Sequence, residues 1–221
     1  MSFWSSPAAT RCAPFALFIA TLIAGSLFSA HAAAREWLVL ARGGLVAVAL
    51  AWYWRDYSEL RRPPTTRPGH WLLAVLAGLV VFLAWIGLDQ QWAKLPRPPG
   101  LNPLLPGGGI DWPTAAGRLA GLALVVPVME ELFWRSFLMR WLARHDFLAV
   151  EPRRVGARAF AATTVLFAVE HDRWLAGGIG GMAYGALYML SGNLWVPILA
   201  HMLTNALLGA WILFTHSWEL W

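Results

Sequence analysis

The sequence of 221 residues contains little cysteine and little charge. Cys12 is the single cysteine, which excludes an intramolecular disulfide and a metal cluster held by several thiolates. Charged residues make up 13% of the chain, whereas a soluble domain usually carries about 25%. Hydrophobic residues reach 58%, so an ordinary soluble fold is excluded and an integral membrane protein is predicted.

Long apolar runs indicate membrane-spanning helices, each of which needs roughly 20 apolar residues. Membrane-spanning strands would alternate apolar and polar residues over about ten positions, a pattern that is missing from this sequence. The predicted fold is therefore all-α, a polytopic transmembrane bundle of about seven to eight helices. The runs are approximately Pro14–Ala33, Glu36–Trp54, Trp71–Leu88, Thr114–Leu142, Ala157–Glu170, Trp174–Leu190 and Leu194–Phe214.

Arginine clusters predict the orientation, because cytoplasmic loops carry the excess of Lys and Arg. One cluster lies between the second and third runs and another between the fourth and fifth, so both face the same side. A cytoplasmic N-terminus and an external loop from Asp89 to Pro113, rich in Pro and Gly, are predicted. These loop arginines account for the net charge of +5, so no nucleic-acid partner is expected. The clusters are Arg55, Arg61, Arg62 and Arg67, then Arg140, Arg144, Arg153, Arg154 and Arg158.

The first apolar run has two interpretations. Arg11, the run itself and the small residues of Ser29–Ala33 resemble a signal peptide with its cleavage site. The length of the run favours a first transmembrane helix instead. No internal repeat or linker indicates a second domain, so a single domain is expected.

Two adjacent carboxylates, Glu130 and Glu131, follow a strongly apolar stretch of the fourth run. Ionisable groups inside membrane helices are costly and by default mark function. Glu131 and Arg135 share a helix face at i, i+4 spacing, so they are expected to pair. Glu130 points elsewhere on the helix and gains no such partner, which suits a general base. The alternative is that this helix ends early and both glutamates are solvated.

Three further polar residues lie in or at the ends of apolar helices. His171 ends the fifth run on the same face as Phe167. His201 and Asn205 share a face of the last helix, which is otherwise apolar. Singly, His171 fits an interfacial histidine, and the other two fit a hydrogen bond between helices. Together with Glu130 they provide the groups needed to activate water and stabilise an oxyanion.

These residues form three motifs by which the chain resembles the CPBP family of intramembrane proteases. That family includes the type II CAAX prenyl endopeptidases and bacterial bacteriocin-processing and immunity proteins. The resemblance covers about Thr114–Phe214, so residues 114–214 are expected to form the catalytic helical core, with residues 1–113 not diagnostic. The motifs EExxxR, FxxxH and HxxxN read here as Glu130-Glu131-x-x-x-Arg135, Phe167-x-x-x-His171 and His201-x-x-x-Asn205.

The resemblance implies a role for each motif residue. Glu130 and His171 would activate the attacking water, and His201 and Asn205 would hold the oxyanion. Glu131 and Arg135 would brace the helix. The implied substrate is a membrane-bound protein or peptide, cleaved within the lipid bilayer.

A narrower likeness links the chain to the CAAX protease-like proteins of bacterial exosortase and PEP-CTERM sorting systems. It rests on Met129–Phe137 and on the ending Trp218-Glu219-Leu220-Trp221. This likeness implies a bacterial inner membrane and exosortase components as partners.

The sequence leaves two questions open: whether the site binds a metal, and whether the protein is an enzyme at all. No cofactor is favoured, but Glu130, His171 and His201 would be a suitable set of zinc ligands. An H-E-x-x-H zinc motif and a rhomboid-type G-x-S-G are both missing from the sequence. The main rival function is a non-catalytic immunity factor or scaffold that retains the protease fold, and a small permease is a weaker rival.

Overall fold

The computed structural model describes residues 6–27, 32–96 and 102–221, and its secondary structure is helical. Among these residues the predicted all-α bundle is confirmed, with seven long helical segments and the short α3 (Ser58–Arg61). One segment is a continuous rod that runs from α5 (Trp112–Ala120) through α6 (Val126–Glu131) to α7 (Met139–Ala143). The other six are α1 (Pro7–Leu27), α2 (Ala32–Trp52), α4 (Pro68–Gly87), α8 (Ala157–Glu170), α9 (Trp174–Ser191) and α10 (Trp195–Thr215).

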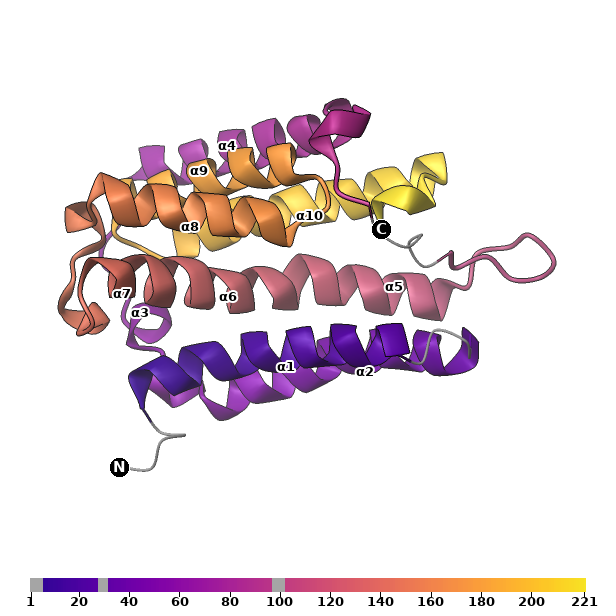
Figure 1. Ribbon diagram of the computed structural model, residues 1–221, viewed down its shortest axis with the longest axis horizontal. Coiled ribbons are helices and arrows are strands. Elements are labelled where there is room, and N and C mark those ends of the chain that lie inside the picture. The colour runs from indigo at the N-terminus through magenta and orange to yellow at the C-terminus, as the bar shows by residue number, and fades with distance from the viewer. Residues whose placement is uncertain (1–5, 28–31, 97–101) are drawn as a thin grey trace.

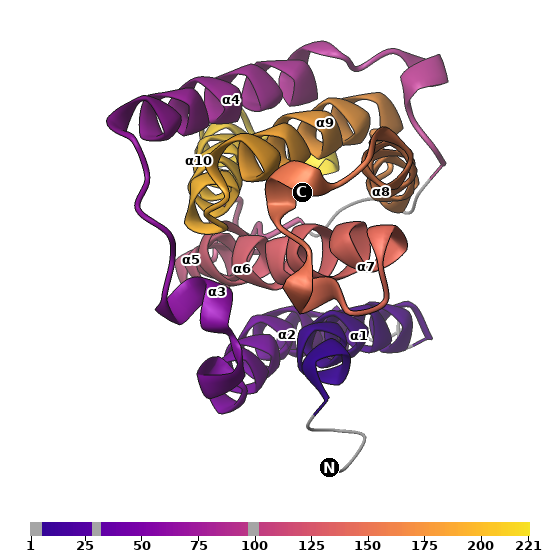
Figure 2. The same ribbon diagram turned by 90° about the vertical axis from the view of Figure 1, so that its left-hand side faces the viewer.

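The helices pack in layers around the α5–α7 rod (Figure 1). On one side α1 and α2 pack against each other and against the rod (Figure 2). On the other side lie α8, α9 and α10, and α4 covers α9 and α10 as the outermost helix. The rod, which carries Glu130, is therefore the central element of the bundle.

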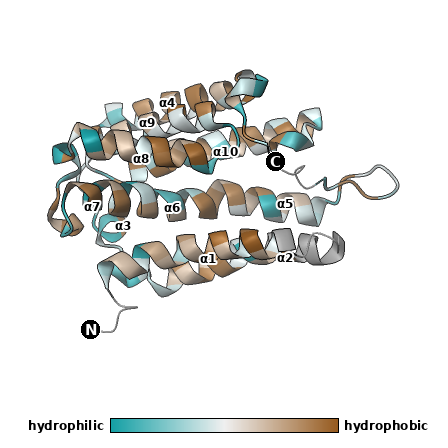
Figure 3. Ribbon diagram, viewed as in Figure 1, coloured by the Kyte–Doolittle hydropathy of each residue, from teal (hydrophilic) through white to brown (hydrophobic). Residues whose placement is uncertain are grey.

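The helices have the length and surface of a membrane protein. Among the described residues, Pro7–Gly25, Pro68–Gly87 and Trp195–Thr215 are long and apolar enough to cross a bilayer. The outer face of α4 exposes Leu72 and Leu83, among other large apolar side chains. Figure 3 shows that hydrophilic residues gather mainly toward the two ends of the bundle. At about 1.5 Å per residue, the 14 residues of α8 reach only about 21 Å, so this helix is shorter than a hydrocarbon layer about 30 Å thick.

Both arginine-bearing loops lie at the same end of the bundle, and the loop that follows α4 lies at the other (Figure 1). The Trp195 indole Nε1 donates to the Leu60 carbonyl at 3.0 Å, which attaches α3 to the start of α10. Leu60 and Val155, one from each loop, belong to the same buried cluster. This arrangement agrees with two loops on one side of the membrane, and their cytoplasmic assignment stays a prediction.

The first helix begins at Pro7, seven residues before the predicted Pro14. Pro7 occupies the first turn, and the Ser6 hydroxyl accepts from the Ala9 N–H at 3.2 Å. Pro14 lies inside the helix and has no N–H for the Thr10 carbonyl. The Tyr57 hydroxyl donates to that carbonyl at 2.9 Å, so a contact from outside the helix makes an internal proline tolerable. The alternative cleavage site falls mainly on residues 29–31, outside the described residues.

Arg140 was predicted to be a loop arginine but lies in α7 and is buried, and Arg11 is buried as well. The two are 5% and 1% exposed. Arg11 forms a bidentate pair with Glu59 at 2.8 and 2.6 Å. Arg140 lies 3.7 Å from the Glu59 carboxylate, and the Ser136 hydroxyl donates a hydrogen bond to that carboxylate. Glu59 in α3 thus joins α1 to the end of the rod, a contact between distant segments that loop composition does not reveal.

Candidate active site

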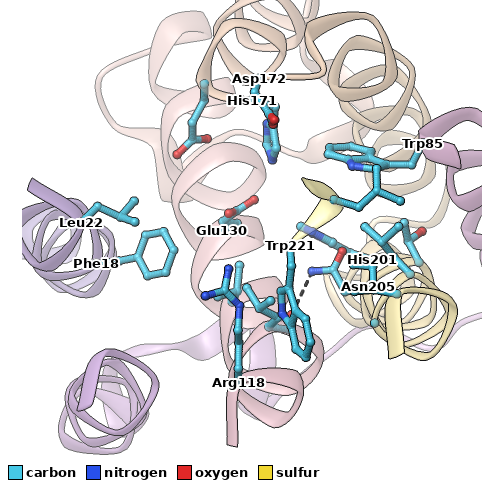
Figure 4. A pocket seen from close by; sticks show the side chains of 18 of the residues that line it. Phe18, Leu22, Trp85, Arg118, Glu130, His171, Asp172, His201, Asn205 and Trp221 are labelled. Carbon is cyan, nitrogen blue, oxygen red and sulfur yellow. Dashed lines mark hydrogen bonds between the residues drawn. The ribbon is translucent and has the colours of Figure 1, made fainter. Parts of the chain in front are cut away.

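A cavity of about 590 Å³ opens beside the rod and brings the four predicted catalytic residues together (Figure 4). Glu130 of α6, His171 at the end of α8, and His201 and Asn205 of α10 all line it. The cavity extends beyond the predicted core, because side chains of α1 and α2 also contribute. Those side chains are Phe18, Ile19, Leu22, Ile23 and Arg42.

Glu130 is 5% exposed and lies at the centre of the cavity view, between His171 and Arg118 (Figure 4). Within the described residues its Oε2 atom has no hydrogen-bond partner. The helix continues past Glu130 as far as Ala143, so the alternative of an early helix end with solvated glutamates was wrong. A buried carboxylate with an unused oxygen is able to accept a hydrogen bond and a proton from a water molecule.

Glu131 is fully buried beside Glu130 but contacts a different set of residues. Its Oε1 accepts from Arg135 Nη1 at 3.1 Å, which confirms the predicted pair. The same oxygen lies 3.0 Å from His201 Nδ1, a contact that spans 70 positions of sequence. Glu131 therefore orients a residue of the cavity as well as neutralising Arg135.

Arg135 connects the first two motifs. Its guanidinium lies 4.2 Å from the centre of the Phe167 ring and 5.5 Å from that of Tyr184. Cations over aromatic faces are stabilised by the ring quadrupole, more strongly when desolvated. The Phe167 ring thus stabilises the Arg135 guanidinium that pairs with Glu131. The Phe167 backbone carbonyl holds His171.

The imidazole of His171 is oriented by its own helix. Its Nδ1 lies 2.8 Å from the Phe167 carbonyl oxygen. Because a carbonyl only accepts, Nδ1 carries the hydrogen and the neutral ring presents a lone pair at Nε2. The edge of Trp85 packs against the ring with centroids 5.3 Å apart. The contact thus places a hydrogen on Nδ1, and Nε2 is the acceptor whenever the ring is neutral.

His201 is oriented by Glu131 and by stacking on Tyr184, with ring centroids 4.8 Å apart and planes 18° apart. The Tyr184 hydroxyl donates to Thr204 at 2.8 Å, and Thr204 donates to the Gly78 carbonyl of α4 at 3.0 Å. Since Glu131 engages Nδ1, Nε2 is the ring nitrogen left for a ligand. A chain of contacts from α9 and α4 therefore holds this imidazole.

Asn205 donates through Nδ2 to the Leu122 carbonyl at 2.8 Å. Leu122 belongs to the π-helical stretch Gly121–Val125. Pro127 follows two residues later and cannot bond the Ala123 carbonyl, which disturbs the helical ladder there. One N–H of the amide is thus used to attach α10 to the rod, which leaves the second N–H for a ligand.

Sequence reasoning missed Glu170, Arg118 and Trp221, which also line the cavity. The Trp134 indole donates to Glu170 Oε2 at 3.1 Å, and the Arg118 guanidinium lies 5.4 Å from the centre of the Trp221 ring. Glu170 could have been predicted, because it is a carboxylate in an apolar helix directly before His171. Arg118 lies near the start of its run, and Trp221 is brought in only by the fold.

The zinc alternative does not fit the arrangement. Among the described residues, no three His, Cys, Asp or Glu side chains are grouped closely enough to hold a metal ion. Glu130, His171 and His201 are included in that statement. No step of a mechanism is therefore assigned to a metal.

Fold and cavity together define a polytopic helical membrane protein with a carboxylate–histidine cavity buried among its helices. Residues 112–207 match the family described as Type II CAAX prenyl endopeptidase Rce1-like, so this segment is similar to the peptidases of that family. The resemblance predicted from the three motifs is confirmed at this level. Searches of the curated proteins and of the solved structures found no match.

Proposed function

We propose that this chain is an intramembrane endopeptidase that hydrolyses a peptide bond of a membrane-associated protein or peptide. The observation that carries the proposal is the single cavity lined by Glu130, His171, His201 and Asn205. The family match to residues 112–207 supports peptide hydrolysis as the reaction. The catalytic core is proposed to be residues 114–214, with α1 and α2 completing one wall of the cavity.

Water activation is proposed for Glu130 and His171, with Glu130 as the base. A water molecule would donate one hydrogen bond to Glu130 and one to His171 Nε2. Glu130 would take the proton as the water oxygen attacks the peptide carbonyl, and would later pass it to the leaving amine. The Phe167 carbonyl supports this role because it fixes the histidine tautomer that accepts at Nε2.

Stabilisation of the oxyanion is proposed for His201 and Asn205. Asn205 would use the N–H that is not bonded to Leu122. With Nδ1–H donating to ionised Glu131, His201 donates from Nε2 only as an imidazolium. Glu131 would hold His201 through Nδ1, which gives the pair of Glu131 and Arg135 a role in orienting His201 in addition to bracing the helix.

The biological setting is proposed from the narrower resemblance. The chain would act in a bacterial inner membrane with a cytoplasmic N-terminus, alongside an exosortase and PEP-CTERM sorting system. Its substrate would be a membrane-bound protein or peptide tail of that system. Catalysis is proposed to be metal-free, so a chelator such as EDTA should leave the activity of the purified protein unchanged.

A non-catalytic scaffold with the same fold is the rival function. The protease and scaffold functions are distinguished by comparing the termini of membrane proteins from cells that produce the chain or its Glu130→Gln variant. If the chain is a protease, mass spectrometry should find new C-termini only with the unaltered chain. Identical ends in both membranes, with the biological effect retained by Glu130→Gln, would leave the scaffold function.

A further inference from the structure

We propose that Arg118, assisted by Arg42, forms a subsite of the cavity that binds a carboxylate of the peptide substrate. The inference rests on the proposed function and adds a determinant of substrate choice. Both arginines line the same cavity as Glu130, although neither belongs to the three motifs. Arg118 is carried by α5, three turns before Glu130 on the same rod, and Arg42 is carried by α2.

The fold brings these two arginines to one region. A Cβ added at Gly43 would lie 3.4 Å from the Gly121 Cα, so α2 and the rod are in close contact there. Arg42 directly precedes Gly43, and Arg118 lies about one turn before Gly121. Arg42 is held in place by Thr21, to which Nε and Nη2 donate at 3.2 and 3.3 Å.

The acidic side chains next to His171 lie at the end of the cavity away from Arg118, while Glu219 of the tail also lines the cavity. In Figure 4, His171 and Asp172 lie on one side of Glu130 and Arg118 lies on the opposite side. Glu170 adds a second carboxylate next to His171. An incoming carboxylate is therefore repelled from the His171 end and attracted to the arginine end, which would orient a peptide across Glu130.

The surroundings of Arg118 favour a planar anion. Apolar side chains such as Leu122 and Val126 line the cavity beside it, and the Trp221 ring lies under its guanidinium. Guanidinium groups bind carboxylates through two parallel hydrogen bonds, and such bonds strengthen where water is excluded.

The tail of the chain already lies at this end. Glu219, Leu220 and Trp221 line the cavity with Trp221 against Arg118, and the 590 Å³ is the space that remains beside them. A short peptide segment therefore fits against the arginine end. The carboxylate of a substrate can belong to its C-terminus or to an acidic side chain, and binding experiments separate the two sources.

The test measures peptide binding by the purified full-length chain with Glu130→Gln, so that no cleavage occurs. Three N-acylated, dye-labelled peptides of the same Ala and Leu sequence serve as probes in fluorescence anisotropy. The first ends in a free carboxylate, the second in a carboxamide, and the third in a carboxamide with one internal Glu. We expect a carboxylate-bearing peptide to bind about tenfold more tightly than the second peptide.

We compare the affinity of the carboxylate-bearing peptide with that of the second peptide as a ratio. Adding Arg118→Gln should bring this ratio close to one, while Arg118→Lys should keep part of the preference. Arg154→Gln, at an exposed arginine outside the cavity, should leave the ratio unchanged. Unaltered binding of the uncharged second peptide in each variant reports an intact cavity. A preference for the first peptide assigns the carboxylate to the C-terminus, and a preference for the third assigns it to a side chain.

A ratio near one before Arg118 is changed, no binding of any peptide, or a ratio that survives Arg118→Gln would overturn the subsite. These outcomes are distinct from failure of the proposed function. If the unaltered chain cleaves no peptide but the ratio depends on Arg118, the protease proposal fails and the subsite stands.

Discussion

Glu130 and Glu131 are adjacent in sequence, and the fold gives them different surroundings. Glu130 faces the cavity, whereas Glu131 contacts Arg135 and His201 through one oxygen. The Oε2 atoms of both glutamates have no hydrogen-bond partner among the described residues. Phe167 lies beneath Arg135, so the three motifs form one connected set of contacts. At the scale of residues, the supporting side chains hold the proposed catalytic groups in position.

Removing Arg135 tests this connection. Arg135→Ala leaves Glu131 buried without its counter-charge, and breaking a buried pair in this way costs about 3–5 kcal/mol. We expect a clearly lower melting temperature in detergent and a loss of peptidase activity, because Glu131, the partner of His201, is no longer held by Arg135. Arg154→Ala is the matched control, since that side chain is 82% exposed and its ion pair lies at the surface. Equal melting temperatures for the two variants would contradict the role given to Arg135.

At the scale of helices, close approaches and prolines position the cavity. Gly78 of α4 packs directly against the backbone of α10 at Ala200, one turn from Thr204 and beside His201. Pro127 accompanies the π-helical stretch whose Leu122 carbonyl receives Asn205. Small changes in how α4, α10 and the rod meet are therefore expected to move the groups that line the cavity.

Gly78→Ala would place a Cβ 2.8 Å from the Ala200 carbonyl oxygen, too close for contact without a shift of α4. We expect destabilisation of about 1–3 kcal/mol, as is usual for overpacking, together with reduced activity. Gly69→Ala in the same helix meets nothing within 4 Å, so it serves as the control and should be neutral or slightly stabilising. Thermal unfolding of both variants checks the prediction, and a stable, fully active Gly78→Ala protein would contradict it.

The contact between α3, α1 and the rod predicts a pH dependence of stability. Burial raises the pKa of Glu59, but the hydrogen bonds and charge of Arg11 and the Ser136 hydroxyl outweigh it and bring the pKa below its ordinary value. A carboxyl with a depressed folded-state pKa stabilises at pH above its unfolded value of about 4.3 and loses this contribution as the pH falls through the folded value.

We therefore expect the melting temperature to change little between pH 7 and about pH 5. Below about pH 4 it should fall more steeply for the unaltered chain than for Glu59→Gln, which has no carboxylate to titrate. Scanning fluorimetry across this range measures the difference. Parallel declines in the two proteins would mean that the Glu59 pair contributes nothing to stability.

Local patterns in the sequence predicted the helices and the pair of Glu131 and Arg135, because both follow from spacing along one helix. The contact of Glu131 with His201 could not be predicted, since it joins residues 70 positions apart. The buried network of Arg11, Glu59 and Arg140 was missed for the same reason. From sequence alone, a buried arginine near a helix end cannot be distinguished from a loop arginine, because the carboxylate that pairs with it is distant in sequence.

At the scale of the whole molecule, the layers explain why α1 and α2 matter although the motifs lie after residue 112. These two helices cover the face of the rod opposite α9 and α10, and they supply one wall of the cavity. The start of α1 and the end of α10 lie at opposite ends of the bundle, as seven passes through a membrane require (Figure 1). The orientation in the membrane follows from the arginines alone and remains a prediction.

Cysteine labelling of intact cells tests this orientation, with Cys12→Ala as the starting variant. A membrane-impermeant maleimide should fail to label Arg62→Cys and Arg154→Cys and should label Asn102→Cys, which lies in the loop after α4. Pro99 was predicted to be external but lies outside the described residues. Labelling of Arg62→Cys and Arg154→Cys from opposite sides would contradict the seven-helix bundle.

The central claim is that Glu130 is the base that activates water in a membrane-embedded peptidase. Its most direct test is the cleavage rate of the purified Glu130→Gln protein on a substrate identified by its new C-terminus. The substitution keeps the size and most of the hydrogen bonding of the side chain but removes its ability to take a proton. The account predicts a rate about 10²–10⁴-fold lower, with peptide binding and melting temperature close to those of the unaltered chain. Cleavage at the unaltered rate would contradict it.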